Sequence, residues 1–511
     1  MLSVVKSMSL IGLDGHLINV QVDVSSGMPC WEIVGLPDIS VKESKERVRT
    51  SIKNSGYEFL SRRIVINLAP ADIKKEGSSF DLPIAIGILI CSEQIKQTSF
   101  DDTIFIGELS LDGTINRVNG ILPICIEARK LRIKRVIVPI ENTKEASIVS
   151  DIEIIGVKSL SEVVKYLNSE IDITPYKTDI NELFNNKSKT VFDFSEVKGQ
   201  ENIKRALEIA AAGGHNCLLV GSPGSGKTMM ARRIPSILPD LNFNEALEIT
   251  KIHSISGNLE KDVGLITARP FRAPHHTVSS TSLIGGGRIP KPGEISLAHN
   301  GVLFLDELPE FNKSTLEVLR GPLEDDIVTI SRVNATLTYP CNFMFVASMN
   351  PCPCGFFGSK DKTCTCSEQS ISRYMNKISG PLLDRIDIQI EVTPVKYKNL
   401  NSSSKEESSF EIKKRVNFAR KIQQNRYKQD KIYSNSQLTP KLIEKYCALD
   451  LESQKLLETA FQKLGLSARA YSRILKVART IADLENKENI ELSHIAEAIQ
   501  YRSLDKKYWR N

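Results

Sequence analysis

The sequence predicts an α/β protein that has an αβα phosphate-binding core and an all-helical C-terminal part. Three observations carry this prediction. Residues 1–168 alternate strand-like and helix-like segments, and a glycine-rich loop at 221–228 lies between an apolar strand and a helix. Residues 410–511 have the apolar spacing of amphipathic helices. The core is therefore expected to lie between an α/β domain and a helical domain.

The chain of 511 residues is long enough for about three domains. Composition divides it into five parts. We expect an N-terminal α/β domain at 1–168, a polar linker at 169–190, a nucleotide-binding core at 191–395, a polar connection rich in Ser, Lys and Glu at 396–409, and a helical lid at 410–511.

Bulk composition is that of a globular protein without a membrane segment. Hydrophobic residues make up 41% and charged residues 25% of the chain. The longest strongly apolar stretch, Leu82 to Cys91, is too short to span a bilayer, and no signal peptide is recognisable. We therefore expect a cytoplasmic protein whose ten cysteines are reduced. The net charge of +6 permits nucleic-acid binding but does not establish it.

Short sequence patterns predict the elements of the N-terminal domain. Residues 63–68 and 135–139 are β-branched and apolar, which predicts strands, whereas 41–54 and 120–130 have helical amphipathic spacing. Strands and helices that alternate in this way favour a mixed sheet covered by helices.

The glycine-rich loop is a complete Walker A motif. Residues 221–228 read Gly-Ser-Pro-Gly-Ser-Gly-Lys-Thr and follow the apolar run 217–220. The glycines let backbone N–H groups turn toward phosphate oxygens. Lys227 is expected to reach the β- and γ-phosphates and Thr228 to ligate Mg²⁺. The predicted nucleotide-binding residues are Gly221, Ser222, Pro223, Gly224, Ser225, Gly226, Lys227 and Thr228.

A second motif supplies two acids. Residues 301–305 form an apolar strand that ends in Asp306 and Glu307, which is the Walker B pattern. Asp306 is expected to hold Mg²⁺, and Glu307 to orient and polarise the attacking water. Since the chain contains no Asn/Thr-Lys-x-Asp guanine-binding motif, ATP is favoured over GTP.

Further motifs follow in the order found in AAA+ ATPases with a helical lid, which the chain resembles. A strand at 345–349 ends at Asn350, residues 380–387 include Arg385, and residues 467–473 include Arg469. The resemblance implies that Asn350 is the first sensor, Arg385 an arginine finger that acts on the neighbouring subunit, and Arg469 the second sensor. Alternatively, Arg385 forms a salt bridge with Asp384 or Asp387, and Arg473 or Lys476 takes the place of Arg469.

The whole chain resembles the YifB/ComM family of magnesium-chelatase-like AAA+ proteins. The resemblance implies a homo-hexameric, ATP-driven motor that acts on single-stranded or branched DNA and promotes branch migration in recombination. A metal-chelatase motor subunit or a protein remodeller is the alternative. Matching segments lie at 35–38 (Gly-Leu-Pro-Asp), 42–44 (Lys-Glu-Ser), 80–83 (Phe-Asp-Leu-Pro), 269–277 (Arg-Pro-Phe-Arg-Ala-Pro-His-His-Thr), 350–355 (Asn-Pro-Cys-Pro-Cys-Gly) and 478–484 (Ala-Arg-Thr-Ile-Ala-Asp-Leu).

Two inserts are expected to line the pore of such a ring. Residues 282–291 contain three consecutive glycines with Arg288 and Lys291, and 327–338 alternate like a β-hairpin that carries Arg332. These cations would grip phosphates without regard to base sequence. The alternative is that both inserts serve packing or allostery. His275 and His276 precede the first insert and are interpreted as structural.

Residues 60–145 resemble the proteolytic domain of Lon proteases. Ser79 falls near the position of the nucleophile, but Leu122 occupies the position that matches the Lys base, and leucine cannot accept a proton. The domain is therefore interpreted as a non-proteolytic scaffold or DNA-facing platform. A protease remains the rival function.

Four cysteines form a possible zinc site. Cys352, Cys354, Cys364 and Cys366 have the spacing C-x-C, nine residues, C-x-C. Four thiolates suit tetrahedral Zn²⁺, although the usual structural pattern is C-x₂-C. The alternative is four reduced thiols in a surface loop beside Asn350.

Overall fold

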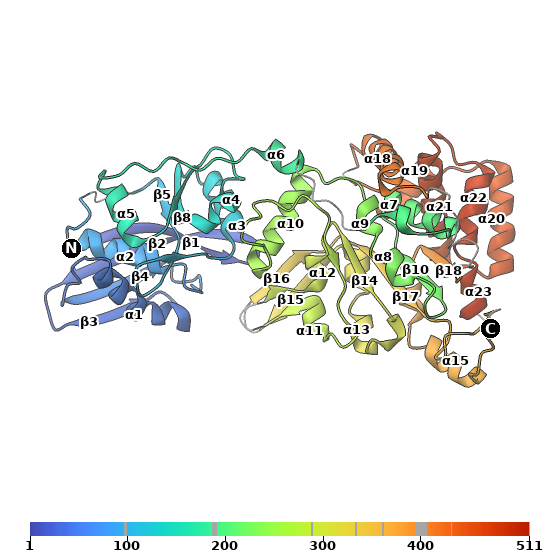
Figure 1. The fold of residues 1–511 in the computed structure, drawn as a ribbon, viewed down its shortest axis with the longest axis horizontal. Coiled ribbons are helices and arrows are strands. Elements are labelled where there is room, and N and C mark those ends of the chain that lie inside the picture. The colour runs from blue at the N-terminus through green and yellow to red at the C-terminus, as the bar shows by residue number, and fades with distance from the viewer. Residues whose placement is uncertain are drawn as a thin grey trace. The chain divides into compact units, whose positions relative to one another are not determined.

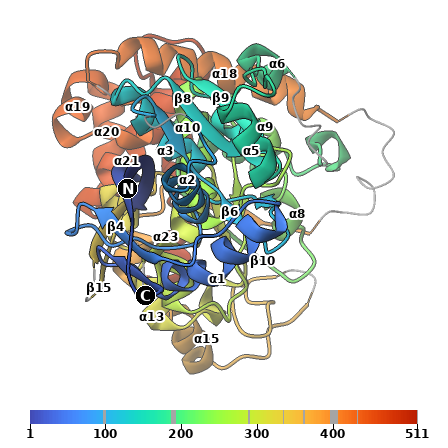
Figure 2. The same cartoon turned by 90° about the vertical axis from the view of Figure 1, so that its left-hand side faces the viewer.

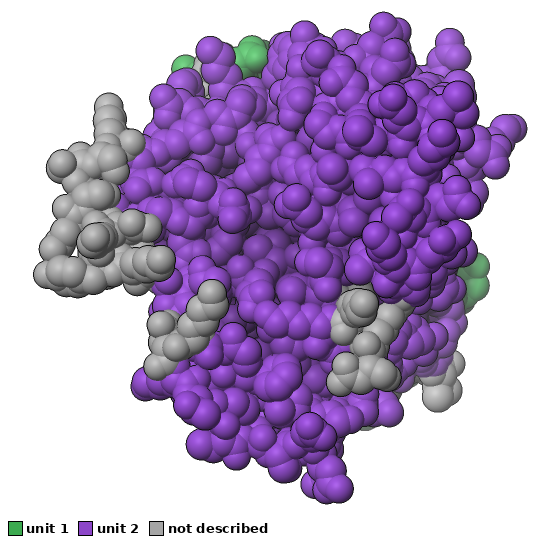
Figure 3. Space-filling view, turned by 90° about the vertical axis from the view of Figure 1, so that its right-hand side faces the viewer, with its two compact units in different colours: residues 1–187, 246–267 green, residues 188–245, 268–511 purple. Residues whose placement is uncertain are grey.

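The computed structural model describes residues 1–96, 100–185, 192–287, 290–332, 335–359, 362–394, 406–430 and 432–509. The chain forms two compact units, which Figure 3 distinguishes by colour. Unit 1 comprises Met1–Lys187 and Ala246–Thr267, and unit 2 comprises Ser188–Glu245 and Ala268–Asn511. The elements are mixed α/β, with a parallel sheet in unit 2 and helices at its C-terminal end, so the predicted fold class is confirmed.

Unit 1 is built on a seven-stranded mixed sheet with the order β3-β4-β2-β1-β5-β8-β9. Strand β2 runs antiparallel to both of its neighbours, β1 and β4, whereas the pairs β3-β4, β1-β5, β5-β8 and β8-β9 are parallel. The strands are β1 (Leu2–Ile11), β2 (Asp14–Ser25), β3 (Cys30–Val34), β4 (Arg63–Ala69), β5 (Thr103–Phe105), β8 (Arg135–Pro139) and β9 (Glu153–Val157), with a small hairpin of β6 (Glu108–Leu109) and β7 (Ile115–Asn116).

Helix α2 (Asp81–Cys91) is the core of unit 1, and all of its residues are buried. It packs against β1 and β2 (Figures 1 and 2). Gly87 permits this close approach, because a Cβ there would lie 2.6 Å from Cγ2 of Val22. The apolar run that is too short for a membrane is therefore a buried core helix. The other helices are α1 (Ile39–Asn54), α3 (Ile121–Lys130), α4 (Thr143–Ala146), α5 (Leu160–Leu167) and α6 (Ile180–Asn185).

Residues 246–267 join unit 1 although they follow the Walker A motif in the chain. They contain most of α10 (Phe243–Ser256). Glu145 is buried in unit 1 and accepts hydrogen bonds from the Ser254 hydroxyl, from the Leu122 amide at 2.9 Å and from Asn142 at 3.3 Å. Burial raises the pKa of Glu145 despite these donors. The sequence pattern predicted that all of 191–395 belongs to the nucleotide-binding core. It contained no signal that residues 246–267 pack in unit 1.

Unit 2 contains a five-stranded parallel sheet with the order β11-β14-β17-β10-β18. β10 and β17 lie inside the sheet, and their side chains are fully buried. The strands are β10 (Cys217–Gly221), β11 (Phe271–Arg272), β14 (Val302–Leu305), β17 (Met344–Met349) and β18 (Ile388–Val392).

Helices and two hairpins surround this sheet. The helices are α7 (Glu201–Gly213), α8 (Lys227–Ala231), α9 (Ile234–Ile237), α11 (Ser280–Ile284), α12 (Glu294–Leu297), α13 (Lys313–Glu317), α14 (Pro322–Asp325), α15 (Glu368–Met375) and α16 (Gly380–Leu383). The hairpins are β12 (Gly285–Gly286) with β13 (Lys291–Pro292), and β15 (Ile327–Arg332) with β16 (Ala335–Pro340).

The C-terminal part of unit 2 is a helical lid. It consists of α18 (Ser409–Arg426), α19 (Pro440–Tyr446), α20 (Leu451–Leu464), α21 (Ala468–Leu484), α22 (Leu492–Gln500) and α23 (Leu504–Tyr508). Most of the predicted connection at 396–409 lies outside the described residues, which resume at 406. Helix α18 begins at Ser409, the last residue of that predicted connection.

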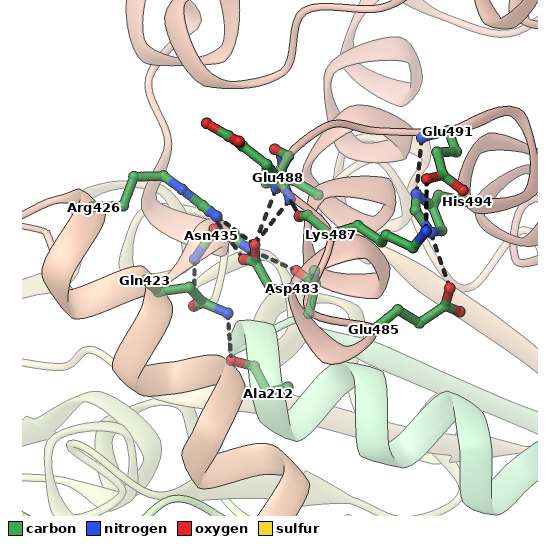
Figure 4. A network of polar contacts seen from close by, with 12 residues as sticks. Ala212, Gln423, Arg426, Asn435, Asp483, Glu485, Lys487, Glu488, Glu491 and His494 are labelled. Atoms are coloured by element: carbon green, nitrogen blue, oxygen red, sulfur yellow. Dashed lines mark hydrogen bonds and ion pairs between the residues drawn. The ribbon is translucent and has the colours of Figure 1, made fainter.

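A buried carboxylate organises the lid (Figure 4). Asp483 on α21 accepts two hydrogen bonds from Arg426 on α18, at 2.5 and 3.0 Å, and one from Arg479 at 3.1 Å. It also accepts from Asn435 at 2.9 Å. Gln423 extends the same network to the core, because its amide donates to the carbonyl of Ala212 on α7 at 3.2 Å. Asp483 therefore joins two lid helices through paired charges.

We expect Asp483→Asn to loosen the lid, because it leaves the guanidinium groups of Arg426 and Arg479 without their counter-charge. Breaking a buried ion pair costs about 3–5 kcal/mol. Hydrogen exchange on the full chain should show lost amide protection in α18 and α21. Glu458→Gln, an exposed change on α20, is the control. Unchanged protection in the Asp483 variant would contradict the assigned role.

Candidate nucleotide-binding site

The Walker A loop connects the buried strand β10 to α8. Gly224 and Gly226 have φ angles of 75° and 92°, which side chains rarely adopt. Gly221 approaches β18 so closely that a Cβ would lie 2.3 Å from the carbonyl oxygen of Val392. Each of these positions therefore needs glycine for a specific backbone reason.

Lys227 is held inside the loop. Its ammonium donates to the carbonyl oxygens of Gly221 at 2.8 Å and Ser222 at 3.0 Å, and to Oδ1 of Asn350 at 3.1 Å. Burial lowers the pKa of Lys227, whereas the nearby charges of Asp306 and Glu307 act in the opposite direction. The structure thus brings the predicted phosphate-binding lysine and the predicted first sensor into direct contact.

The predicted Mg²⁺ ligands also meet. The hydroxyl of Thr228 donates to Oδ2 of Asp306 at 2.7 Å, which joins the Walker A and Walker B motifs. The hydroxyl of Ser225 is buried and has no hydrogen-bond partner among the described residues. A hydroxyl, a carboxylate and an unpaired buried donor beside a loop lysine fit a nucleotide phosphate with Mg²⁺.

Glu307 lies at the end of β14 in a left-handed conformation, with φ at 53°. Its side chain is exposed, whereas Asp306 is half-buried. The Glu307 amide donates to Oδ1 of Asp306 at 3.1 Å. This turn separates the two acids, so that one faces Thr228 and the other is left accessible for a water-activating role.

Two residues of the site were missed by the sequence analysis. Ser348 donates to Oδ1 of Asp306 and so orients the carboxylate. Gln200 donates to the carbonyl oxygens of Ser225 at 3.3 Å and Thr393 at 2.9 Å, which ties the loop to the segment after β18. Ser348 could have been found from its position two residues before Asn350, whereas Gln200 carries no comparable signal.

Arg385 is directed into its own chain. Its guanidinium donates to the carbonyl oxygens of Arg320 at 3.1 Å and Pro381 at 2.7 Å, and it pairs with Glu324. Only 9% of its side-chain surface is exposed. Within one chain, the structure therefore does not bring Arg385 together with Lys227 or Asp306. Among the described residues, the acid that pairs with Arg385 is Glu324 and not Asp384 or Asp387, which were the alternatives predicted from the sequence.

The three cations at the start of α21 have different surroundings. Arg469 is 59% exposed and lies 3.7 Å from Asp384. Arg473 is paired with the buried Asp387, and the Lys476 ammonium donates to the carbonyl of Ser436 at 2.7 Å. Since the latter two are occupied by these contacts, Arg469 is the one of the three that remains accessible for a ligand.

The two predicted pore inserts pack against each other. A Cβ at Gly285 would lie 2.7 Å from Ile330, and one at Gly286 would lie 3.3 Å from the guanidinium of Arg332. The hydroxyl of Tyr339 donates to the carbonyl of Pro290 at 2.8 Å. Lys291 and Arg332 are exposed. Arg288 lies outside the described residues.

The remaining candidates fall into separate environments. The sulfurs of Cys352, Cys354, Cys364 and Cys366 all lie within 4.8 Å of one another, and they are the only such group of potential metal ligands among the described residues.

The rings of His275 and His276 are 4.0 Å apart. Leu122 is fully buried at the start of α3 in unit 1, so its position carries no base. Within the described ranges, no helix is long and apolar enough to cross a membrane.

Three family models match the chain, and all describe magnesium chelatase. "Subunit ChlI of Mg-chelatase" matches residues 20–142, "Magnesium chelatase, subunit ChlI" matches 193–400, and "Magnesium chelatase, subunit ChlI C-terminal" matches 406–502.

Similar proteins extend the match to nearly the full chain. Competence protein ComM of Haemophilus influenzae is 44% identical over 507 residues, which is 98% of each chain. The uncharacterized protein YifB of Escherichia coli is 44% identical over 509 residues, covering 99% of this chain and 98% of its own. Magnesium-chelatase subunit ChlI of Cyanophora paradoxa is 25% identical over 191 residues, covering 32% of this chain and 54% of its own.

We expect Glu307→Gln to bind ATP and to hydrolyse it slowly. The contacts of Lys227, Thr228 and Asp306 remain, but the group that polarises water is lost, which lowers turnover by about 10²–10⁴-fold. Nucleotide binding and phosphate release should be measured on the same preparation. Glu310→Gln, an exposed change in the adjoining 3₁₀ turn at Leu308–Glu310, should turn over ATP normally. Equal rates in the two variants would rule out Glu307 as the activating group.

Proposed function

Because the chain belongs to the YifB/ComM family of magnesium-chelatase-like AAA+ ATPases, we propose that it is a hexameric, ATP-driven DNA translocase or helicase that promotes branch migration. Such a motor would act on single-stranded or branched DNA in the cytoplasm during recombination. The proposal is carried by the similarity to a competence protein, which extends over 98% of both chains.

The ATPase part of the proposal rests on the nucleotide site. Family membership indicates an ATPase. The hydrogen bond between Thr228 and Asp306 supports it, because these two side chains would hold Mg²⁺, and Lys227, which lies beside Asn350, would contact the phosphates. Hydrolysis would be initiated by a water molecule that Glu307 polarises, with Lys227 stabilising charge on the transferred phosphoryl group.

The DNA part of the proposal is supported by the paired inserts. Strands β15 and β16 bury Val328, Ile330 and Tyr339 on one face. The opposite face exposes hydroxyl groups, which pair across the hairpin between Thr329 and Thr338 at 3.2 Å and between Ser331 and Thr336 at 3.2 Å. A hydroxyl-rich surface can bind phosphates by hydrogen bonds, without reading bases. Arg332, on the face of Val328 and Ile330, lies exposed at the end of β15 beside Gly286 and adds a positive charge at that end of the hairpin.

The alternative is a magnesium-chelatase-type motor or a remodeller of a protein partner. The family descriptions favour it, but the relative described as a chelatase subunit covers 32% of this chain at 25% identity. A Lon-like protease has weaker support, since buried Leu122 replaces the base. Casein cleavage that requires ATP and is lost in Ser79→Ala would favour the protease instead.

The deciding experiment is ATP turnover with and without a four-way DNA junction, together with direct junction binding. The proposal expects junction binding and faster turnover when the junction is present. Neither binding nor stimulation in an assembled, ATP-hydrolysing preparation would reject the DNA function and favour a protein or metal-linked role.

Arg332→Ala should weaken DNA binding. If each Arg332 neutralises one phosphate, the variant should lower the slope of log affinity against log salt by about one per contacting subunit. Lys291→Ala should act in the same direction. The control is Lys455→Ala, which removes an exposed lysine from α20 of the lid. If the slope of log affinity against log salt is the same in all three variants and in the unmodified protein, the inserts do not contact DNA phosphates.

A mixing experiment tests whether Arg385 acts in a neighbouring subunit. Arg385→Ala and Lys227→Ala chains should each be inactive, because a missing arginine finger costs about 10³–10⁵-fold in rate. Mixed rings should regain part of the activity, since an intact loop from one chain can meet an intact arginine from the other. Rings that contain both chains and stay inactive would show that Arg385 acts within its own chain.

A further inference from the structure

Four cysteine sulfurs converge in the loop that follows β17. The sulfur of Cys352 lies 3.3 Å from that of Cys354 and 3.7 Å from that of Cys364, and Cys354 and Cys364 are 3.5 Å apart. The sulfur of Cys366 lies within 4.8 Å of all three. Two C-x-C segments separated by nine residues therefore close onto one point.

These separations fit a shared metal ion. A tetrahedral Zn²⁺ with Zn–S bonds of about 2.3 Å places its sulfurs about 3.8 Å apart, whereas a disulfide would hold two of them at about 2.05 Å. All four cysteines are free thiols in the structure. Only one residue separates the cysteines within each pair, which is closer than the usual structural zinc pattern. The four sulfurs still converge, because the loop brings the pair Cys364 and Cys366 back to the pair Cys352 and Cys354.

Backbone amides support the sulfurs. The amide of Phe357 donates to the sulfur of Cys352 at 3.3 Å, that of Cys354 donates to Cys366 at 3.4 Å, and that of Cys366 donates to Cys364 at 3.4 Å. Amides directed at sulfur stabilise the negative charge of thiolates, and such hydrogen bonds also orient metal ligands. Surface thiols with no ligand have no need for three amide donors.

The same loop rests on the phosphate-binding loop. Gly355, one residue after Cys354, has φ at 85°, and a Cβ there would lie 2.4 Å from Cδ and 2.7 Å from Cγ of Pro223. Pro223 is the third residue of the Walker A motif. The cysteine loop also begins two residues after Asn350, which accepts the hydrogen bond of Lys227. The cluster is therefore attached to the nucleotide site at two points.

We propose that Cys352, Cys354, Cys364 and Cys366 form a structural Zn²⁺ site, and that the bound zinc braces the Walker A loop through the contact of Gly355 with Pro223. The packing of Gly355 on Pro223 then contributes to the affinity for nucleotide. The inference rests on nucleotide binding at this site and is independent of the proposed DNA function, since its readouts are zinc content and nucleotide affinity alone.

The first experiment measures metal in the full-length protein. Purified protein should contain about one zinc per chain, and Cys354→Ser/Cys366→Ser should contain almost none. Cys30→Ser changes an exposed cysteine on β3 and should keep its zinc. Zinc-free wild-type protein, equal zinc in the double variant, disulfides among the four cysteines, or iron in place of zinc would each overturn the proposal.

The second experiment tests the brace with all four cysteines present, by measuring the affinity for a fluorescent ATP analogue. Gly355→Ala should keep its zinc but bind nucleotide about tenfold more weakly, because its methyl group would force Pro223 to move. Gly358→Ala is the matched control. Its φ is also left-handed at 73°, but a Cβ there would meet only the Lys507 side chain, at 3.7 Å.

A further variant separates the contact from general strain in the loop. Pro223→Ala removes the ring atoms that the new methyl group would strike, so Pro223→Ala/Gly355→Ala should bind nucleotide more tightly than Gly355→Ala alone. Gly355→Ala with wild-type affinity, an equal loss in Gly358→Ala, or no recovery in the double variant would overturn the brace. Folding of each variant is checked by its retained zinc.

Discussion

The nucleotide site depends on the register of three adjacent parallel strands. β17 lies between β10 and β14, and it aligns Val220 with Met349 on one side and Leu305 with Ala347 on the other. Each strand therefore ends at the same edge of the sheet. The residues that follow the strands meet there, and this is why Lys227, Asp306 and Asn350 converge although the chain separates them widely. The buried strands fix this register, since sliding any of them would displace apolar side chains from the core.

A buried charge network connects that sheet to the lid. Asp387, just before β18, accepts a hydrogen bond from the amide of Asn216 at 3.0 Å, lies 3.4 Å from Nδ1 of His215 and pairs with Arg473 on α21. Burial alone would raise the pKa of Asp387, but Arg473 and His215 outweigh it and hold the pKa well below its usual range. The lid is thus attached to the start of β10 by a charge that stays ionised at neutral pH, so lid position and the base of the nucleotide-binding strand are mechanically coupled.

The parts of the site that lie on contiguous segments could be predicted from the sequence. The Walker A loop, the Walker B acids and the α/β fold class follow from local spacing and apolar runs, because neighbouring residues largely determine turns and buried strands. Contacts between distant loops could not be predicted. The excursion of 246–267 into unit 1 depends on Glu145 meeting Ser254. The packing of Gly355 on Pro223 depends on two loops that only the folded sheet brings together. For Arg385, the motif identified a residue type in a position, but it carried no information about the carbonyl groups that hold the guanidinium.

The surroundings of Arg385 set an energetic condition on any role in a neighbouring subunit. Hydrogen bonds from a charged group contribute about 1.5–3 kcal/mol each, and the partly exposed pair with Glu324 adds about 0–1 kcal/mol. Releasing the side chain therefore costs about 3–7 kcal/mol in total by the same principles. An arginine finger gains about 10³–10⁵-fold in rate, which corresponds to about 4–7 kcal/mol. The two quantities are similar, so a finger role requires that contacts across a ring interface replace the carbonyls of Arg320 and Pro381. An in-chain role, in which Arg385 fixes the turn between α16 and β18, requires no such exchange.

The carbonyl contact with Arg320 also means that a displacement of Arg385 would disturb the turn after α13, where the Arg320 side chain is 43% exposed and pairs with Glu317. Release of the finger and rearrangement of that surface would therefore occur together.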